Sequence, residues 1–150
     1  MGLISICTNM NFLPLQRFID AQERDYQTAL AEIKNGKKRS HWMWYIFPQI
    51  SGLGRSEAAK YYAIKDRQEA IEFLNHPVLS NRLFEICEAL VELEQDDPHV
   101  IFGSPDDIKL RSSMTLFAAI SGRSSIFKKV IDQYFDGIAD LQTTKIIGRS

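Results

Sequence analysis

The chain of 150 residues has little of several features that would place it in a specialised class. Its two cysteines, Cys7 and Cys87, form no CxxC pair and have no neighbouring histidine, which argues against a disulfide framework and a structural zinc site. The three histidines, His41, His76 and His99, are scattered, so the sequence predicts no metal site. Free cysteines fit a reduced, cytoplasmic setting.

An excess of basic charge and long apolar runs are also missing. The net charge of −1 lacks the basic excess of nucleic-acid-binding proteins, so nucleic acid is not an expected partner. No segment approaches the ~18–20 apolar residues of a membrane span, and no membrane partner is predicted. Because repeats and linkers are absent, we expect a single domain over residues 12–150, after an N-terminal extension of residues 1–11.

Helical signals dominate what is present. Apolar residues recur at three-four spacing from about residue 15 to 35, and Gly36 is a typical stop. Caps and proline positions predict further helices at 56–64, 66–75, 77–93, 97–103, 104–120 and 125–135, with a last one from residue 140. The sequence therefore predicts an all-α fold, a compact multihelical domain of about six to eight helices, with room for a very short β pair near residues 45–47.

Three local expectations accompany this assignment. Cys87 lies on the apolar stripe of the helix that starts at Pro77 and is predicted to be a small buried residue. Ser104 is predicted to cap the following helix, with Pro105 as its first residue. The basic cluster 37–39 is predicted to be a solvated turn that stabilises a helix C-terminus.

One run combines aromatic and polar residues without a helical or strand period. It reads HWMWYIFPQ from residue 41 and leads into GLGRS at residue 52. Aromatic side chains each bury about 150–250 Å², so their density here indicates either a core anchor or a ligand pocket. The polar and glycine residues of the run favour the pocket. His41 is also a candidate acid or base. The candidate ligand-binding residues of the run are His41, Trp42, Trp44, Gln49, Gly52, Gly54 and Ser56.

A second segment carries an unusual polar face. Lys109, Ser112 and Ser113 lie at i, i+3 and i+4, so they share one side of a helix. The hydroxyls can bond back to carbonyls one turn earlier, or they can join Lys109 in gripping an anion such as phosphate. We expect residues 41–56 and 107–117 to pack against each other, since each has groups that need partners.

Three stretches of the sequence resemble one known family. They are HWMWYIFPQISGLGRSEAAKYYAI, AIEFLNHPVLSNRL and IFGSPDDIKLRSSMTLFA, within a similarity that runs from about Phe12 to Ile147. The chain resembles the domain-of-unknown-function family 1810, whose members are often labelled calpastatin-like. Calpastatin inhibits calpain through extended, disordered segments, whereas this composition is globular, so the label is discounted. The resemblance implies a compact multihelical fold and no established activity, substrate or cofactor.

Two functions remain open from the sequence. The first is a polar-aromatic pocket that binds, and in one version acts on, an anionic small molecule such as a nucleotide or an ADP-ribose-like compound. In that interpretation Trp42 and Trp44 stack on a ring while Lys109 and Ser112 hold the anion. The alternative is a non-catalytic protein-interaction module with an aromatic surface. The cofactor, the oligomeric state and the existence of a catalysed reaction are left open.

Overall fold

The computed structural model describes residues 13–122 and 124–149, and the predicted N-terminal extension lies outside them. Within the described ranges the chain forms a short 3-10 helix and nine α-helices, so the all-α prediction is confirmed. In chain order they are η1 (Leu13–Leu15), α2 (Gln16–Lys34), α3 (Met43–Ile46), α4 (Glu57–Tyr61), α5 (Arg67–Asn75), α6 (Pro77–Glu92), α7 (Pro98–Phe102), α8 (Asp106–Ser121), α9 (Ile126–Phe135) and α10 (Leu141–Arg149).

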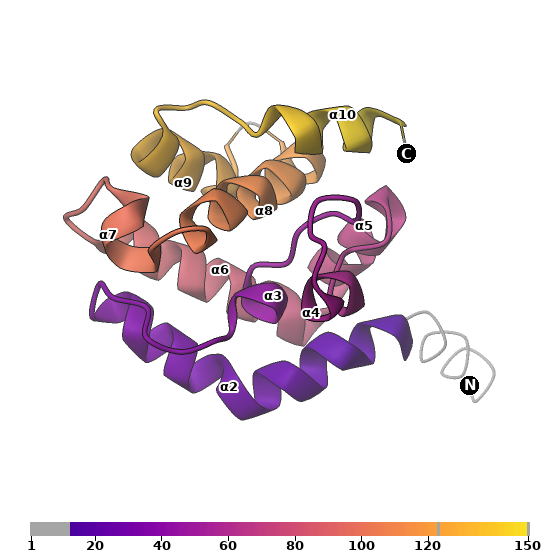
Figure 1. Ribbon diagram of the computed structural model, residues 1–150, viewed down its shortest axis with the longest axis horizontal. Coiled ribbons are helices and arrows are strands. Elements are labelled where there is room, and N and C mark those ends of the chain that lie inside the picture. The colour runs from indigo at the N-terminus through magenta and orange to yellow at the C-terminus, as the bar shows by residue number, and fades with distance from the viewer. Residues whose placement is uncertain (1–12, 123, 150) are drawn as a thin grey trace.

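The helices stack around one continuous core. α2 packs on α6, α6 packs on α9, and α8 packs on both α9 and α10. Figure 1 shows α2 along one edge of the molecule and α10 along the opposite edge, with α3 and α4 in the space between α2 and α8. This central position places the aromatic run between the first and the later helices. None of the helices in the described residues has both the length and the apolar character that crossing a membrane requires.

Local signals in the sequence set most helix boundaries. The predicted helix over residues 15–35 is α2, and Gly36 leaves it with a φ of 74°, donating its N–H to the carbonyl of Ile33. The side chains of Ser56, Asp66 and Ser125 each accept a bond from the backbone N–H three residues later, as N-caps do. These expectations are confirmed because capping depends on neighbours within one helical turn.

The helix from Pro77 also follows its sequence. Leu79, Leu83, Ile86 and Leu90 are buried along α6, as the apolar stripe predicts. Cys87 is fully buried beside them with its sulfur 3.7 Å from that of Met114, and burial raises the pKa of the thiol well above its ordinary value. The prediction of a small buried cysteine is confirmed.

Four expectations need correction. The predicted β pair at residues 45–47 is replaced by α3, which is too short to show a period of 3.6. With α3 the described residues hold nine α-helices, more than the expected six to eight. A single parallel bridge instead joins Ile50 to Ile64. Ser104 does not cap α8, because the carbonyl of Pro105 accepts the first bonds of that helix, from the N–H groups of residues 108 and 109.

The fourth correction concerns the basic cluster. The side chain of Lys38 is only 7% exposed and its ammonium lies 2.9 Å from the carboxylate of Asp106. It also lies 5.0 Å from the centre of the Trp42 ring, and its backbone N–H donates to the carbonyl of Ile101. Lys38 therefore ties the turn after α2 to the start of α8, an arrangement that the neighbouring residues alone do not indicate.

Candidate functional site

The two tryptophans of the aromatic run point to different surroundings. Trp42 lies at the N-cap of α3 and Trp44 is the second residue of that helix. Residues two apart on a helical turn do not face each other, so their rings diverge. Trp42 is fully buried, whereas Trp44 is only partly buried and lines a pocket.

Trp42 belongs to the core. Its indole N–H donates to a carboxylate oxygen of Glu32 at 2.8 Å, and its ring packs against Phe47 and Phe102. With no exposed surface it offers no face to a ligand. The interpretation of Trp42 as a stacking surface is therefore corrected, because the ring is covered on all sides by the helices around it.

The carboxylate of Glu32 organises this buried half of the run. It accepts hydrogen bonds from the backbone N–H groups of Arg39 and Ser40, from the Ser40 hydroxyl and from Trp42. Burial raises the pKa of Glu32, but these bonds outweigh it and lower the pKa from 4.5 to about 2. Glu32 thus holds the turn after α2 against the first tryptophan.

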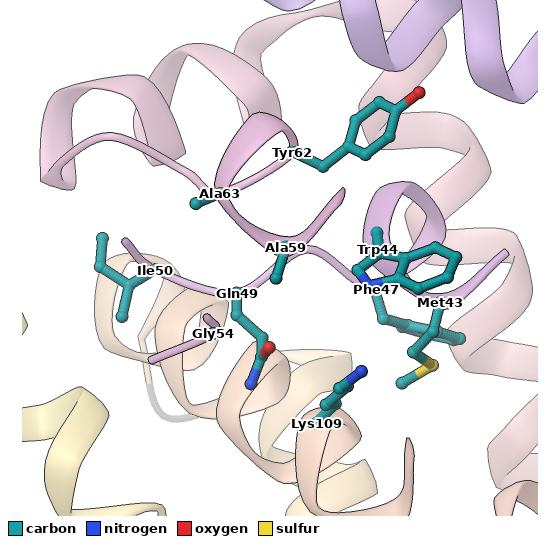
Figure 2. Close-up of a pocket in the computed structure, with 10 residues that line it drawn as sticks. All are labelled: Met43, Trp44, Phe47, Gln49, Ile50, Gly54, Ala59, Tyr62, Ala63 and Lys109. Atoms are coloured by element: carbon teal, nitrogen blue, oxygen red, sulfur yellow. The ribbon is translucent and has the colours of Figure 1, made fainter. Parts of the chain in front are cut away.

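The pocket opens on the other side, beside Trp44 (Figure 2). The nitrogen of the Trp44 indole lies on the side of the ring that faces Gln49 and Lys109, and the Gln49 amide has its oxygen on the side of Lys109. The Trp44 nitrogen is buried and has no hydrogen-bond partner among the described residues. The full lining is Met43, Trp44, Phe47, Gln49, Ile50, Gly54, Ala59, Tyr62, Ala63 and Lys109.

Lys109 brings the second predicted segment to this pocket. Its ammonium lies 5.5 Å from the centre of the Trp44 ring, a cation–π distance. This contact between α8 and the aromatic run confirms the prediction that residues 41–56 and 107–117 meet. The nearest carboxylate oxygen, on Asp106, is 3.6 Å away, which is long for a hydrogen bond. An ammonium has three donors, so Lys109 retains capacity for another acceptor.

The pocket is narrow. The volume that the centre of a water molecule can occupy is about 10 Å³. A cavity needs roughly 10–15 Å³ on this measure to hold one water. The space therefore suits a single oxygen atom, and a ring could not enter without displacement of the lining.

Hydrogen bonds to the backbone hold the pocket wall that is formed by Gln49 and the end of α4. Ile64 donates its N–H to the carbonyl of Gln49 and accepts from Ser51, both at 2.8 Å, which fixes the start of the Gln49 side chain. The guanidinium of Arg17 donates to the carbonyls of Tyr61 and Ala63, at 2.9 and 2.8 Å. These bonds tie the end of α4 to α2 and leave the pocket wall little freedom.

Arg17 also pairs with the buried carboxylate of Glu69 at 2.8 Å. Glu69 accepts at 2.9 Å from the backbone N–H of Lys65, one residue before the Asp66 cap. A standard capping box would have directed this side chain to the Asp66 N–H. Tertiary pairing with Arg17 therefore uses a residue that the sequence assigns to a purely local role.

The glycines of the run have steric reasons. A Cβ on Gly54 would collide with the Cβ of Ala59, so only glycine allows α4 to close on the pocket. Gly52 has a φ of 105°, which disfavours any other residue, and lies near Ile146 of α10. Gly54 lines the pocket, whereas Gly52 is an exposed turn residue outside the lining.

Three other candidates lie away from the lining. His41 is exposed, and its backbone carbonyl accepts a hydrogen bond from the Tyr45 hydroxyl. Ser56 caps α4 by accepting from the N–H of Ala59 at 3.1 Å. Ser112 donates to the carbonyl of Ile108 at 3.3 Å, the back-bonding that the sequence left open.

Ser113 is the fourth of these candidates outside the lining. It is fully buried, and its hydroxyl has no hydrogen-bond partner among the described residues. It does not belong to the pocket lining. Of the ten candidate residues, the structure thus brings Trp44, Gln49, Gly54 and Lys109 together around one space.

Sequence reasoning missed residues that shape this space. Asp106 is the main one, because it contacts both Lys38 and Lys109. Its position three residues before Lys109 on a helix was an available signal. The apolar wall of Ala59, Tyr62 and Ala63 carried no signal, since it depends on how α4 folds back. In the described ranges no three His, Cys, Asp or Glu side chains gather as metal ligands would.

A family model and a solved structure both match this chain. Residues 13–147 match the family described as Protein of unknown function (DUF1810). The chain is similar to the crystal structure of the conserved hypothetical protein Rv1873 from Mycobacterium tuberculosis, with 39% sequence identity and a TM-score of 0.87. That similarity covers 89% of this chain and 96% of the other. No curated protein matches. The chain belongs to the DUF1810 family.

Proposed function

We propose that this protein binds an anionic small molecule at the pocket of Trp44, Gln49 and Lys109. The observation that carries the proposal is the buried indole N–H of Trp44, which faces the pocket and has no hydrogen-bond partner among the residues that the structure describes. A buried donor without an acceptor costs about 1–3 kcal/mol, a cost that a ligand oxygen would remove. Lys109 adds a positive charge to the lining of the same pocket.

The proposal assigns no reaction. His41, the candidate acid or base, is exposed and lies outside the lining, so the geometry gives it no substrate to protonate. Nucleotides and ADP-ribose-like compounds carry suitable anions, but their rings would have to lie outside a pocket of this size. The pocket therefore fits the anionic group of such a ligand, and the ring lies outside it.

The alternative of an aromatic interaction surface loses its main support. Trp42, Tyr45 and Phe47 are 0%, 4% and 1% exposed, so the run presents little aromatic area to a partner. Interface anchors must be accessible before the partner arrives. The pocket is the better use of the residues that remain.

A thermal-shift panel tests the proposal. The full chain is heated with sodium phosphate, sulfate, acetate, nucleotides or ADP-ribose, against sodium chloride at matched ionic strength. A ligand at 100 times its dissociation constant adds about 2.7 kcal/mol of stability, enough for a clear rise in Tm. We expect Lys109→Met to abolish the rise and Lys129→Met, at an exposed lysine of α9, to retain it. No rise with any compound, in a folded protein, would refute the proposal.

A cytoplasmic location is also proposed. Its support is the free, buried thiol of Cys87, which fits a reducing compartment. Fractionation of cells that express the tagged full chain would test it, and recovery outside the cytoplasm would overturn it.

A further inference from the structure

The size of the Trp44 pocket limits the shape of the group that enters it. A space for about one water accepts one oxygen atom. A carboxylate is planar and can insert one oxygen while the second stays at the entrance. A phosphate is tetrahedral, and its three or four oxygens need a wider bowl of donors. Shape therefore favours the carboxylate.

The charges beside the pocket favour the same group. Lys38 and Lys109 both contact Asp106, at 2.9 and 3.6 Å, so these three side chains sum to one positive charge. The next carboxylate, on Asp107, lies 3.4 Å from the imidazole of His99. A phosphate monoester carries about −1.5 to −2 charges near neutral pH, and Asp106 would repel the excess. A carboxylate carries one.

The donors differ from those of typical phosphate sites. Such sites use arginine forks or the free N–H groups of a helix N-terminus. Here the lining supplies one indole N–H, one amide and one ammonium, all from side chains. The N-terminus of α8 carries Asp106 and Asp107 in its first turn, which disfavours a further anion at those amides.

Resting on the proposed function, we infer that the pocket is selective for a carboxylate over a phosphate. One carboxylate oxygen accepts from the Trp44 indole N–H inside the pocket. The other faces the ammonium of Lys109 at the entrance. The remainder of the acid lies outside the pocket.

Indole signals in nitrogen-15 NMR spectra test this selectivity. The full chain has two tryptophans and gives two indole cross-peaks, which Trp44→Phe assigns. The Trp42 N–H is already bonded to Glu32, so its peak is an internal control. Sodium acetate and sodium phosphate are titrated separately at pH 7.5, with sodium chloride at the same ionic strength as reference.

We expect acetate to move the Trp44 peak saturably while the Trp42 peak stays in place. Phosphate should bind at least about tenfold more weakly, because of its additional charge beside Asp106. Lys109→Met should remove the acetate response, and Lys129→Met should keep it. If Lys109→Met alters the Trp42 peak, Lys109→Gln replaces it as the milder variant.

The two proposals fail differently. If neither anion moves the Trp44 peak beyond the chloride control, the carboxylate inference is overturned, and the thermal-shift panel with nucleotides and ADP-ribose then decides the proposed function. If phosphate binds equally well or more tightly than acetate, anion binding stands and the carboxylate inference is overturned. A saturable acetate response that survives in both Lys109 variants also overturns it.

Discussion

The aromatic run has two halves, one around Trp42 and one around Trp44. They use the same residue types for different purposes, the first in the core and the second at a pocket. Trp42 has its N–H bonded to Glu32 and no exposed surface, whereas the N–H of Trp44 is buried beside a pocket and has no partner within residues 13–122 and 124–149. Each ring has a lysine over its face, Lys38 at 5.0 Å and Lys109 at 5.5 Å. The difference lies in what each N–H faces: the Trp42 N–H faces the carboxylate of Glu32, and the Trp44 N–H faces the pocket.

One aspartate connects the two halves. The Asp106 carboxylate lies 2.9 Å from the ammonium of Lys38 and 3.6 Å from that of Lys109. Lys38 is almost fully covered, while the side chain of Lys109 is 25% exposed. The closer, buried pair serves the fold, and the looser pair leaves Lys109 available at the pocket. Similar contacts can therefore serve structure on one side and binding on the other.

The largest expected effect comes from truncating the buried tryptophan. Trp42→Ala should destabilise the protein by about 3–5 kcal/mol, because it leaves a cavity and removes a donor from Glu32. Trp44→Ala should cost less, on the order of 1–3 kcal/mol, since its ring is only partly buried. Urea melts of both variants measure the difference. Equal losses would break the comparison between the two halves.

Removing the charge of Glu32 should come next. At neutral pH Glu32→Gln should cost about 1.5–3 kcal/mol, since four donors lose a charged acceptor. The folded-state pKa is lowered from 4.5 to about 2, so the stabilisation is present above pH 4.5 and is lost as the pH falls toward 2. Urea melts from pH 7 to 2.5 should show the gap between variant and parent closing. Glu88→Gln, at an exposed position of α6, is the control and should show no such gap.

Closing the space at Gly54 should have an intermediate effect on the Trp44 half. Gly54→Ala should cost about 1–3 kcal/mol, because the new Cβ would collide with Ala59 and push α4 away. Gly148→Ala in α10 has open space around it and should stabilise the protein by about 0.4–1 kcal/mol. Thermal unfolding of the pair checks both signs. A neutral Gly54→Ala would show that the pocket wall can move.

The smallest effect sharpens the comparison most. Trp44→Phe should change stability by less than about 1 kcal/mol, because no described residue bonds to the N–H that is lost. Trp42→Phe should cost about 1–3 kcal/mol, because it takes a hydrogen bond from Glu32. Chemical denaturation of the two conservative variants separates the N–H from the ring. A large loss for Trp44→Phe would mean that its N–H already has a structural acceptor.

Part of the candidate site was predictable from the residues. Density of aromatic and polar groups located the run, and the polar face of α8 located Lys109. The contact between the two segments followed from their complementary needs and is confirmed by the Lys109–Trp44 distance. The members of the site were harder to predict, because Ser112 and Ser56 form hydrogen bonds within their own helices and lie outside the pocket lining.

The sequence alone determined most of the helices, since periodicity, caps at Ser56, Asp66 and Ser125, and prolines act within one turn, but not α3. Only the tertiary structure decided which tryptophan is core and which is site. That choice depends on Glu32, ten residues before Trp42, and on Lys109, which comes from a distant helix. The covalent chain gives two neighbouring indoles nearly equal chemistry. The packing of α2 and α8 around them gives the Trp42 N–H an acceptor and places the Trp44 N–H where no described residue accepts it.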